Sequence, residues 1–269
     1  MERDVDSSRE REPTIQVDGV NFEVRNAVAI ITIDRPRAHN AMNGAVRAGL
    51  FAAFDRVERD PRISVAILTG TGDRAFCAGI DLKEAAETQL QVPPRDFLPI
   101  LGDTIEVSKP VIAAVNGMAF AGGWVLAQMC DLCVASTSAS FAITEAKVGR
   151  GMPWAVPLIH MIPQRIMMEL LLLGEPISAQ RAYEIGFVNR VVAPDALMTT
   201  AMGIATRIVE NAPLTVQAAK ELVRIATETG RSAARRSADH LFERVYRSSD
   251  AQEGPRAFRE KRAPRWRGE

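Results

Sequence analysis

Two glycine-containing turns hold the residues whose backbone could do chemistry. In the first, residues 116–123 interrupt an apolar run, and a helical pattern resumes at Trp124. The first amide groups of a helix have no partner within the helix, and partial positive charge gathers there. Glycines also let a ligand approach the backbone closely. This turn therefore predicts a site for an oxyanion, with tight packing of the glycines as the alternative.

The second turn follows the strand expected at residues 63–68 and reads FCAGIDLKE at residues 76–84. Gly79 lets the backbone bend sharply, which leaves the amide of Ile80 without a partner ahead of a polar helical stretch. Two such donors at neighbouring strand ends can hold one oxygen atom. That arrangement stabilises a thioester enolate or a tetrahedral oxyanion, where the loss of one donor costs roughly 100- to 1000-fold in rate.

Alternating strands and helices must position these turns. Short apolar runs predict strands at residues 20–24, 28–33, 63–68, 111–115, 132–135 and 141–143. Between the second and third of these strands, residues 41–59 carry apolar side chains at helical spacing, which predicts a βαβ crossover. Helical patterns dominate afterwards, at residues 166–173, 178–185, 196–211, 213–227 and 233–248.

These patterns predict an α/β fold in three parts. Residues 1–13 are highly charged and are expected to be a disordered tail, residues 14–195 an α/β core, and residues 196–269 a helical C-terminal region. No linker rich in Gly, Ser or Pro separates the last two parts. The helical region is therefore expected to pack on the core or on a neighbouring subunit.

The composition favours a small-molecule substrate. The 269 residues are 47% hydrophobic and 25% charged, with 33 basic and 33 acidic side chains. A net charge of zero provides no field that attracts nucleic acid or an anionic membrane, so neither is expected as a partner. No run of about 18 apolar residues occurs and the charged N-terminus lacks an apolar signal segment, so we expect a cytoplasmic protein.

Two local features have both a structural and a binding interpretation. Three cysteines are too few for a disulfide framework, and Cys130 and Cys133 are expected to flank a strand rather than to bind a metal. Arginine and lysine crowd the last forty residues. That crowd predicts a solvated helical face or, alternatively, a surface for a phosphate-bearing ligand.

Several segments together resemble the crotonase superfamily of enoyl-CoA hydratases and isomerases. They are FCAGIDLKE (76–84), KPVIAAVNG (109–117) and AGGWVLAQMCD (121–131), with RPRAHNAMN (35–43), GEPISAQRAYEIGFVNRVV (174–192) and FREKR (258–262) also in family order. The resemblance spans nearly the whole chain. It implies a crotonase-like ββα spiral core with a helical C-terminal region, assembled as a homotrimer or a dimer of trimers.

The resemblance also implies roles for individual residues. The amides of Ile80 and Gly122 would form an oxyanion hole for an acyl-CoA thioester substrate. Lys261 would lie near the nucleotide phosphates, often those of an adjacent subunit. No cofactor is expected beyond the coenzyme A of the substrate. The path of coenzyme A and its pantetheine arm would be lined by His39, Ala41, Met42, Ala78, Ile80, Asp81, Leu82 and Lys83.

The catalytic carboxylates decide which reaction such an enzyme performs. Hydratases of this superfamily usually carry two glutamates, and the second matches Glu145. At the first position, three residues after Gly122, this chain has Val125. A single base suffices to shift a double bond. The resemblance thus implies a hydratase that works with one glutamate, with a Δ3,Δ2-enoyl-CoA isomerase or a non-catalytic acyl-CoA-binding protein as alternatives.

Other residues leave open what replaces the missing glutamate and how the acyl pocket is shaped. Glu84 or Glu87 could supply a substitute carboxylate, or both could lie on a solvated helix face. Residues 148–158 depart from the glycine-rich pattern of the superfamily. Within them, Trp154 either reshapes the acyl pocket or fills the core, and Arg150 either meets an acidic substrate or lies on the surface.

Overall fold

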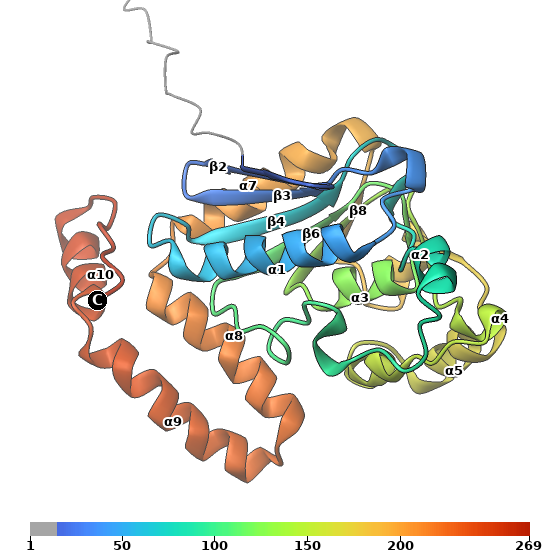
Figure 1. The fold of residues 1–269 in the computed structure, drawn as a ribbon. Helices are drawn as coiled ribbons and strands as arrows, with labels where there is room; N and C mark the ends of the chain where they lie inside the picture. Colours follow the sequence, from blue (N-terminus) through green and yellow to red (C-terminus); the bar gives the residue numbers. More distant parts are fainter. Residues whose placement is uncertain (1–14) are drawn as a thin grey trace, which may run out of the picture.

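The computed structural model describes residues 15–269 and arranges them in two sheets surrounded by helices (Figure 1). The tail predicted at residues 1–13 lies outside the described residues. The strands are β1 (Ile15–Val17), β2 (Val20–Arg25), β3 (Val28–Ile33), β4 (Val65–Gly70), β5 (Ala75–Cys77), β6 (Val111–Val115), β7 (Met118–Phe120), β8 (Leu132–Ser136), β9 (Ser140–Ala142), β10 (Ile177–Ser178) and β11 (Arg190–Val192). The α-helices are α1 (Gly44–Arg59), α2 (Leu82–Glu87), α3 (Gly122–Gln128), α4 (Glu145–Val148), α5 (Gln164–Leu173), α6 (Ala179–Glu184), α7 (Leu197–Val209), α8 (Pro213–Glu228), α9 (Arg231–Arg247) and α10 (Asp250–Glu260). Short 3-10 helices are η1 (Pro36–Ala38), η2 (Arg95–Phe97), η3 (Pro153–His160) and η4 (Pro194–Ala196).

The larger sheet has seven strands in the order β1-β2-β3-β4-β6-β8-β11. Its first three strands are antiparallel, and the hairpin between β2 and β3 turns at Asn26 and Ala27, both at positive φ. From β3 onward the strands are parallel. The predicted crossover from β3 through α1 to β4 is confirmed, with Asn43 capping α1 by accepting a hydrogen bond from the amide of Val46.

The smaller sheet, β10-β9-β7-β5, turns the chain into a repeating unit. Each of β4, β6 and β8 in the larger sheet is followed by β5, β7 or β9 in the smaller sheet and then by α2, α3 or α4. This is the expected ββα spiral, and the predicted fold class is confirmed. Since β5, β7 and β9 are parallel neighbours, the turns after them lie side by side at one edge of the smaller sheet.

Several short strands and two helices were not expected from the sequence; they are β1, β5, β7, β10, β11, α4 and α10. Residues 116–123 are not one continuous turn, because β7 forms within them and pairs with β5 and β9. A strand of three residues between glycines has too few positions to reveal an alternating pattern. Helix α10 was not expected either, since Gly254 and Pro255 argue against a helix there.

Two apolar clusters cover the two faces of the larger sheet. One side packs on α1, on the smaller sheet and on α3, and the other side packs on α7. Because α7 packs on the sheet, the division of the chain at residue 195 stays a prediction. Helices α8, α9 and α10 continue away from the sheets as an arm (Figure 1). None of the helices in residues 15–269 is long and apolar enough to cross a membrane.

Candidate active site

Three consecutive repeats of the spiral bring the predicted catalytic residues together. Ile80 follows β5, Gly122 follows β7 and begins α3, and Glu145 follows β9 and begins α4. Each therefore occupies the same place in its repeat, between the strand of the smaller sheet and the helix. The amide of Ala121 donates a 2.8 Å hydrogen bond to the carbonyl of Ala142, which ties the second turn to the third.

The amides of Ile80 and Gly122 lie next to each other. A Cβ atom built on Gly79 would lie 3.3 Å from the nitrogen of Gly122, and one built on Gly122 would lie 3.5 Å from the nitrogen of Ile80. Neither amide donates a hydrogen bond to another group of the described chain. As the first residue of α3, Gly122 also has no partner within its helix. The two N–H groups are thus available to one shared acceptor.

Backbone geometry explains why these turns need glycine. Gly79 has a φ of +104°, which side chains rarely adopt. A Cβ atom on Gly123 would come within 1.9 Å of the carbonyl oxygen of Cys77, so only glycine lets β5 and α3 approach this closely. Ala121 has a φ of +51° although it carries a side chain, a strained geometry worth about 1–3 kcal/mol. From the sequence, the glycines could serve either an oxyanion site or tight packing. In the structure they pack closely, and they do so around two amides that have no partner in the described chain.

Glu145 is buried beside this turn, with 6% of its surface exposed. Its Oε1 accepts a 3.0 Å hydrogen bond from the indole Nε1 of Trp154, and its Oε2 is buried without a hydrogen-bond partner among the described residues. Burial raises the pKa of Glu145, against the opposing hydrogen bonds from its own amide and from Trp154. The shift makes the protonated form of Glu145 easier to reach than that of an exposed glutamate, which favours a role in acid–base catalysis.

No second carboxylate stands at the position of the missing glutamate. Val125 fills that position and is 1% exposed. Glu84, a possible substitute, accepts hydrogen bonds from the amide of Gly44 (2.7 Å) and from Arg47 (2.8 Å). Burial opposes its ionisation, but these bonds outweigh burial and lower the pKa of Glu84. Glu84 therefore holds α1 and α2 together as a charged group, while Glu87 is exposed to solvent.

The two segments predicted to line the coenzyme A path run side by side. Ala78 donates its amide to the carbonyl of His39, and the amide of Met42 bonds the carbonyl of Gly79 at 2.8 Å. Asp81 caps α2 and pairs with Arg35 at 3.0 Å. Met42 is buried, whereas His39, Leu82 and Lys83 are exposed and Ala41, Ala78, Ile80 and Asp81 are partly exposed. The structure thus brings these residues into one strip, which includes Ile80, whose amide donates to no other group of the described chain.

Lys261 is not part of this strip within one chain. It ends α10 in the left-handed conformation, and α10 lies on the far side of the molecule from α2 (Figure 1). Many of the neighbouring basic residues are engaged in ion pairs, of which the most buried is that of Glu253 with Arg256 and Arg262. The choice between a solvated face and a phosphate-binding surface stays open.

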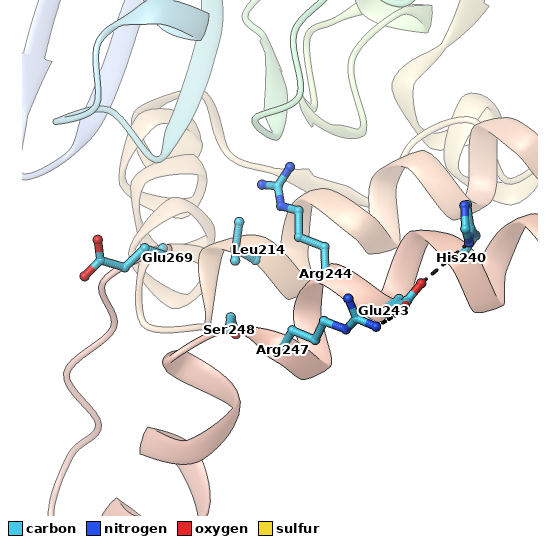
Figure 2. Close-up of a pocket in the computed structure, with 8 residues that line it drawn as sticks. Leu214, His240, Glu243, Arg244, Arg247, Ser248 and Glu269 are labelled. Atoms are coloured by element: carbon cyan, nitrogen blue, oxygen red, sulfur yellow. Dashed lines mark ion pairs between the residues drawn. The ribbon is translucent and has the colours of Figure 1, made fainter.

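A cavity of about 640 Å³ lies in the arm rather than at the turns (Figure 2). Glu243 in its wall pairs with Arg247 and His240. None of the predicted site residues lines it. Its two carboxyl groups, those of Glu243 and Glu269, are not buried, so we place the candidate active site at the three turns. The cavity is lined by Leu214, His240, Glu243, Arg244, Arg247, Ser248, Gly268 and Glu269.

The remaining predicted residues have mostly structural contacts. Arg150 donates a 2.6 Å hydrogen bond to the carbonyl of Leu90, so it joins the loop after α4 to the loop after α2. Cys133 is buried in β8, and the thiol of Cys130 bonds the carbonyl of Leu126. Trp154 packs against the core, but its contact with Glu145 was not expected from the sequence. This contact depends on the path of the chain from α4 into the 3-10 helix η3, and no periodic pattern in the sequence predicts that path.

The chain is similar in sequence and in fold to known proteins. Residues 23–269 match the sequence profile of the enoyl-CoA hydratase/isomerase family. The chain is 40% identical to the carnitinyl-CoA dehydratase of Proteus mirabilis (strain HI4320) over 259 residues, covering 93% of this chain and 98% of the relative. It is 41% identical to the (E)-benzylidenesuccinyl-CoA hydratase of Thauera aromatica over 258 residues, covering 93% and 99%. A crystal structure of an enoyl-CoA hydratase from Mycobacterium marinum superposes with a TM-score of 0.87 at 39% identity, covering 93% of this chain and 99% of that one.

Proposed function

The chain belongs to the enoyl-CoA hydratase/isomerase family, and from this premise we propose that it is a lyase that hydrates an α,β-unsaturated acyl-CoA thioester, or dehydrates the product. Glu145 is its single acid–base group. The observation that carries the proposal is that two amides without partners in the described chain and one buried carboxyl group follow the ends of β5, β7 and β9.

The reaction follows from the roles of these three groups. The thioester oxygen accepts hydrogen bonds from the amides of Ile80 and Gly122. The carboxylate of Glu145 takes a proton from water as the water oxygen bonds to Cβ. The electron pair of the double bond then moves into the enolate, whose negative oxygen the two amides stabilise. The protonated Glu145 finally delivers its proton to Cα, which restores the carboxylate and completes the addition of water.

A single glutamate suffices in this scheme because one proton is taken and the same proton is returned. Val125 cannot transfer protons, so Glu145 must act in both steps. Its raised pKa supports this double role, because the group loses its proton less readily than an exposed glutamate. The scheme uses no metal, and its only coenzyme is the coenzyme A that the substrate carries.

Two alternatives use the same site. An isomerase would move one proton between Cα and Cγ of a 3-enoyl-CoA, which also needs only one base. A binding protein would hold the ester without turnover. The names of the relatives, a dehydratase and a hydratase, favour hydration. Oε2 of Glu145 is buried and has no hydrogen-bond partner among residues 15–269, which favours catalysis over simple binding because burial of an unused carboxyl group costs stability.

We further propose that the enzyme assembles as a homotrimer or a dimer of trimers. In an assembly, Lys261 of one subunit can reach the coenzyme A strip of another, which it does not do within its own chain. Large apolar side chains remain exposed on the arm and around α5, which supports burial against other copies. They include Val156, Met168, Leu172, Leu173, Tyr246 and Phe258. A cytoplasmic location and the absence of nucleic-acid or membrane partners stay predictions from the sequence.

A direct assay tests the proposed reaction. Crotonyl-CoA and a 3-enoyl-CoA are supplied in turn, and the absorbance of the conjugated thioester is followed. Hydration consumes the conjugated thioester of crotonyl-CoA, so the absorbance should fall. A rise with the 3-enoyl-CoA and no change with crotonyl-CoA would instead identify an isomerase. Heat of binding for both esters without turnover would identify the binding protein.

A further inference from the structure

A chain of two hydrogen bonds leads from helix α3 to the candidate catalytic carboxyl group. The side-chain amide of Gln128, the last residue of α3, donates a 2.9 Å hydrogen bond to the backbone carbonyl of Trp154. Trp154 in turn donates its indole N–H to Oε1 of Glu145 at 3.0 Å. The helix that begins with the Gly122 amide therefore also anchors the residue that holds Glu145.

The chemistry of the indole limits what each oxygen of Glu145 can do. An indole N–H is a donor and never an acceptor. Oε1 must therefore accept in both protonation states of Glu145. A neutral carboxyl group has one O–H and one carbonyl oxygen, and the carbonyl oxygen is the stronger acceptor, so the indole favours the proton on Oε2. That oxygen has no hydrogen-bond partner in the described chain, which leaves it available to the reacting atoms.

We propose that Trp154 is a positioning residue that commits Oε1 of Glu145 to the indole and leaves Oε2 as the oxygen that takes and returns the proton. The proton-transfer part of this inference rests on the proposed function. The hydrogen bond that commits Oε1 to the indole is independent of the proposed function, because it follows from the geometry alone. Trp154 thus has a role that neither filling the core nor shaping the pocket requires.

Charged neighbours do not offer another explanation for the state of Glu145. Burial raises the pKa of Glu145, hydrogen bonds from its own amide and from Trp154 oppose the rise, and no charged partner among the described residues contributes. On its own helix, Lys147 pairs with Glu175 at 2.6 Å. Arg150 is bonded to the carbonyl of Leu90. The ionisable groups of the adjoining η3 and α5 are exposed to solvent; these are His160, Arg165 and Glu169.

The commitment of Oε1 can be tested without any substrate. The chain has three tryptophans, so isotope labelling of the indole nitrogens gives three N–H resonances. The Trp154 resonance, identified by its loss in Trp154→Phe, should titrate with the ionisation of Glu145. The titration should vanish in Glu145→Gln. The indoles of Trp124, which has no partner in the described chain, and Trp266, which bonds the carbonyl of Glu210, should not titrate with it.

The effect of Trp154 on proton transfer by Glu145 is tested by the pH dependence of kcat. Trp154→Phe removes a donor that favours the charged form of Glu145, so the pKa of Glu145 should rise. Activity that requires the carboxylate should then fall off at a higher pH than in the unmodified enzyme. At the original optimum, kcat should drop about 10-fold. Trp124→Phe is the matched control, since it removes a buried indole N–H that has no hydrogen-bond partner in the described chain, and it should leave the midpoint of the profile in place.

The outcomes separate this inference from the proposed function. A Trp154 resonance that ignores Glu145, or a Trp154→Phe profile with an unmoved midpoint, would overturn the positioning role. A Trp124→Phe midpoint that moves as far as that of Trp154→Phe would overturn it as well. Titration of Trp154 in a protein that turns over no enoyl-CoA ester would overturn the proposed function while supporting the commitment of Oε1.

Discussion

Two glutamates of this protein are buried to almost the same extent but have opposite hydrogen-bonding environments. Glu145 in the spiral core is 6% exposed and Glu253 in the C-terminal arm is 5% exposed. Glu145 receives its one side-chain hydrogen bond from a neutral indole and keeps Oε2 without a partner in the described chain. Glu253 binds Arg256, Arg262 and the amide of Arg265.

The surroundings move the two pKa values apart. Burial raises the pKa of Glu145. Hydrogen bonds from Arg262 and Arg256 hold the pKa of Glu253 far below its usual range. Burial alone therefore does not decide what a carboxyl group does. Neutral donors leave it able to exchange a proton, whereas cationic donors fix it as a permanent charge that holds the chain together.

Replacement of each glutamate by glutamine should give the largest difference in kcat between the two sites. Glu145→Gln keeps the shape and the bond to Trp154 but cannot transfer a proton, so kcat should fall roughly 100- to 10,000-fold. Affinity for an acyl-CoA ester, measured by calorimetry, should change little. Glu253→Gln should leave kcat at saturating substrate within a few-fold. Equal losses of kcat in the two variants would break the comparison.

The stability of the same variants should depend on pH with opposite signs. Since the folded-state pKa of Glu145 is raised, its ionisation weakens the fold as pH rises above the ordinary glutamate pKa of about 4.3. Glu145→Gln should therefore melt a few degrees above the unmodified protein at neutral pH, and this difference should fade in acid. Since the pKa of Glu253 is lowered, it stabilises the fold above its ordinary pKa, and that contribution is lost as pH falls.

Glu253→Gln should accordingly melt below the unmodified protein at neutral pH and approach it in acid. Melting curves of the three proteins from about pH 2 to about pH 8 check both signs, because the contribution of Glu253 is lost only below the ordinary glutamate pKa of about 4.3. Two variants displaced in the same direction at neutral pH would contradict the assignment of one glutamate to chemistry and the other to structure.

The sequence predicts the spiral core well because its strands are apolar runs closed by turn residues. The strands at β4, β6 and β8 and the helix α1 follow directly from such patterns. Strand β7 and helix α10 were missed for a physical reason. Three residues are too short to show a period, and Gly254 with Pro255 disfavour a helix that the Glu253 ion pairs nonetheless help to hold.

The candidate site is predictable only where a motif marks it. Ile80, Gly122 and Glu145 stand in motifs that resemble those of a known superfamily, and the spiral brings their turns together. The bond from Trp154 to Glu145 has no such mark, since it depends on the path of the loop from Val148 through η3. The sequence shows that the segment around Trp154 departs from the family pattern, but it does not show that Trp154 contacts Glu145.

Loss of the hydrogen bond from Gln128 should give the smallest effect on the pH profile of kcat. It tests whether neutral donors alone hold Glu145 in place. Gln128→Met keeps the volume but removes the donor to the Trp154 carbonyl, a bond worth about 0.5–1.5 kcal/mol. The variant also removes the buried Oε1 of Gln128, which has no partner in the described chain, so overall stability should change little. With Trp154 less firmly held, the kcat profile should move toward higher pH by less than in Trp154→Phe. Because both changes act through one contact, adding Gln128→Met to Trp154→Phe should move the midpoint no further. An additive shift would mean that Gln128 reaches Glu145 by another route.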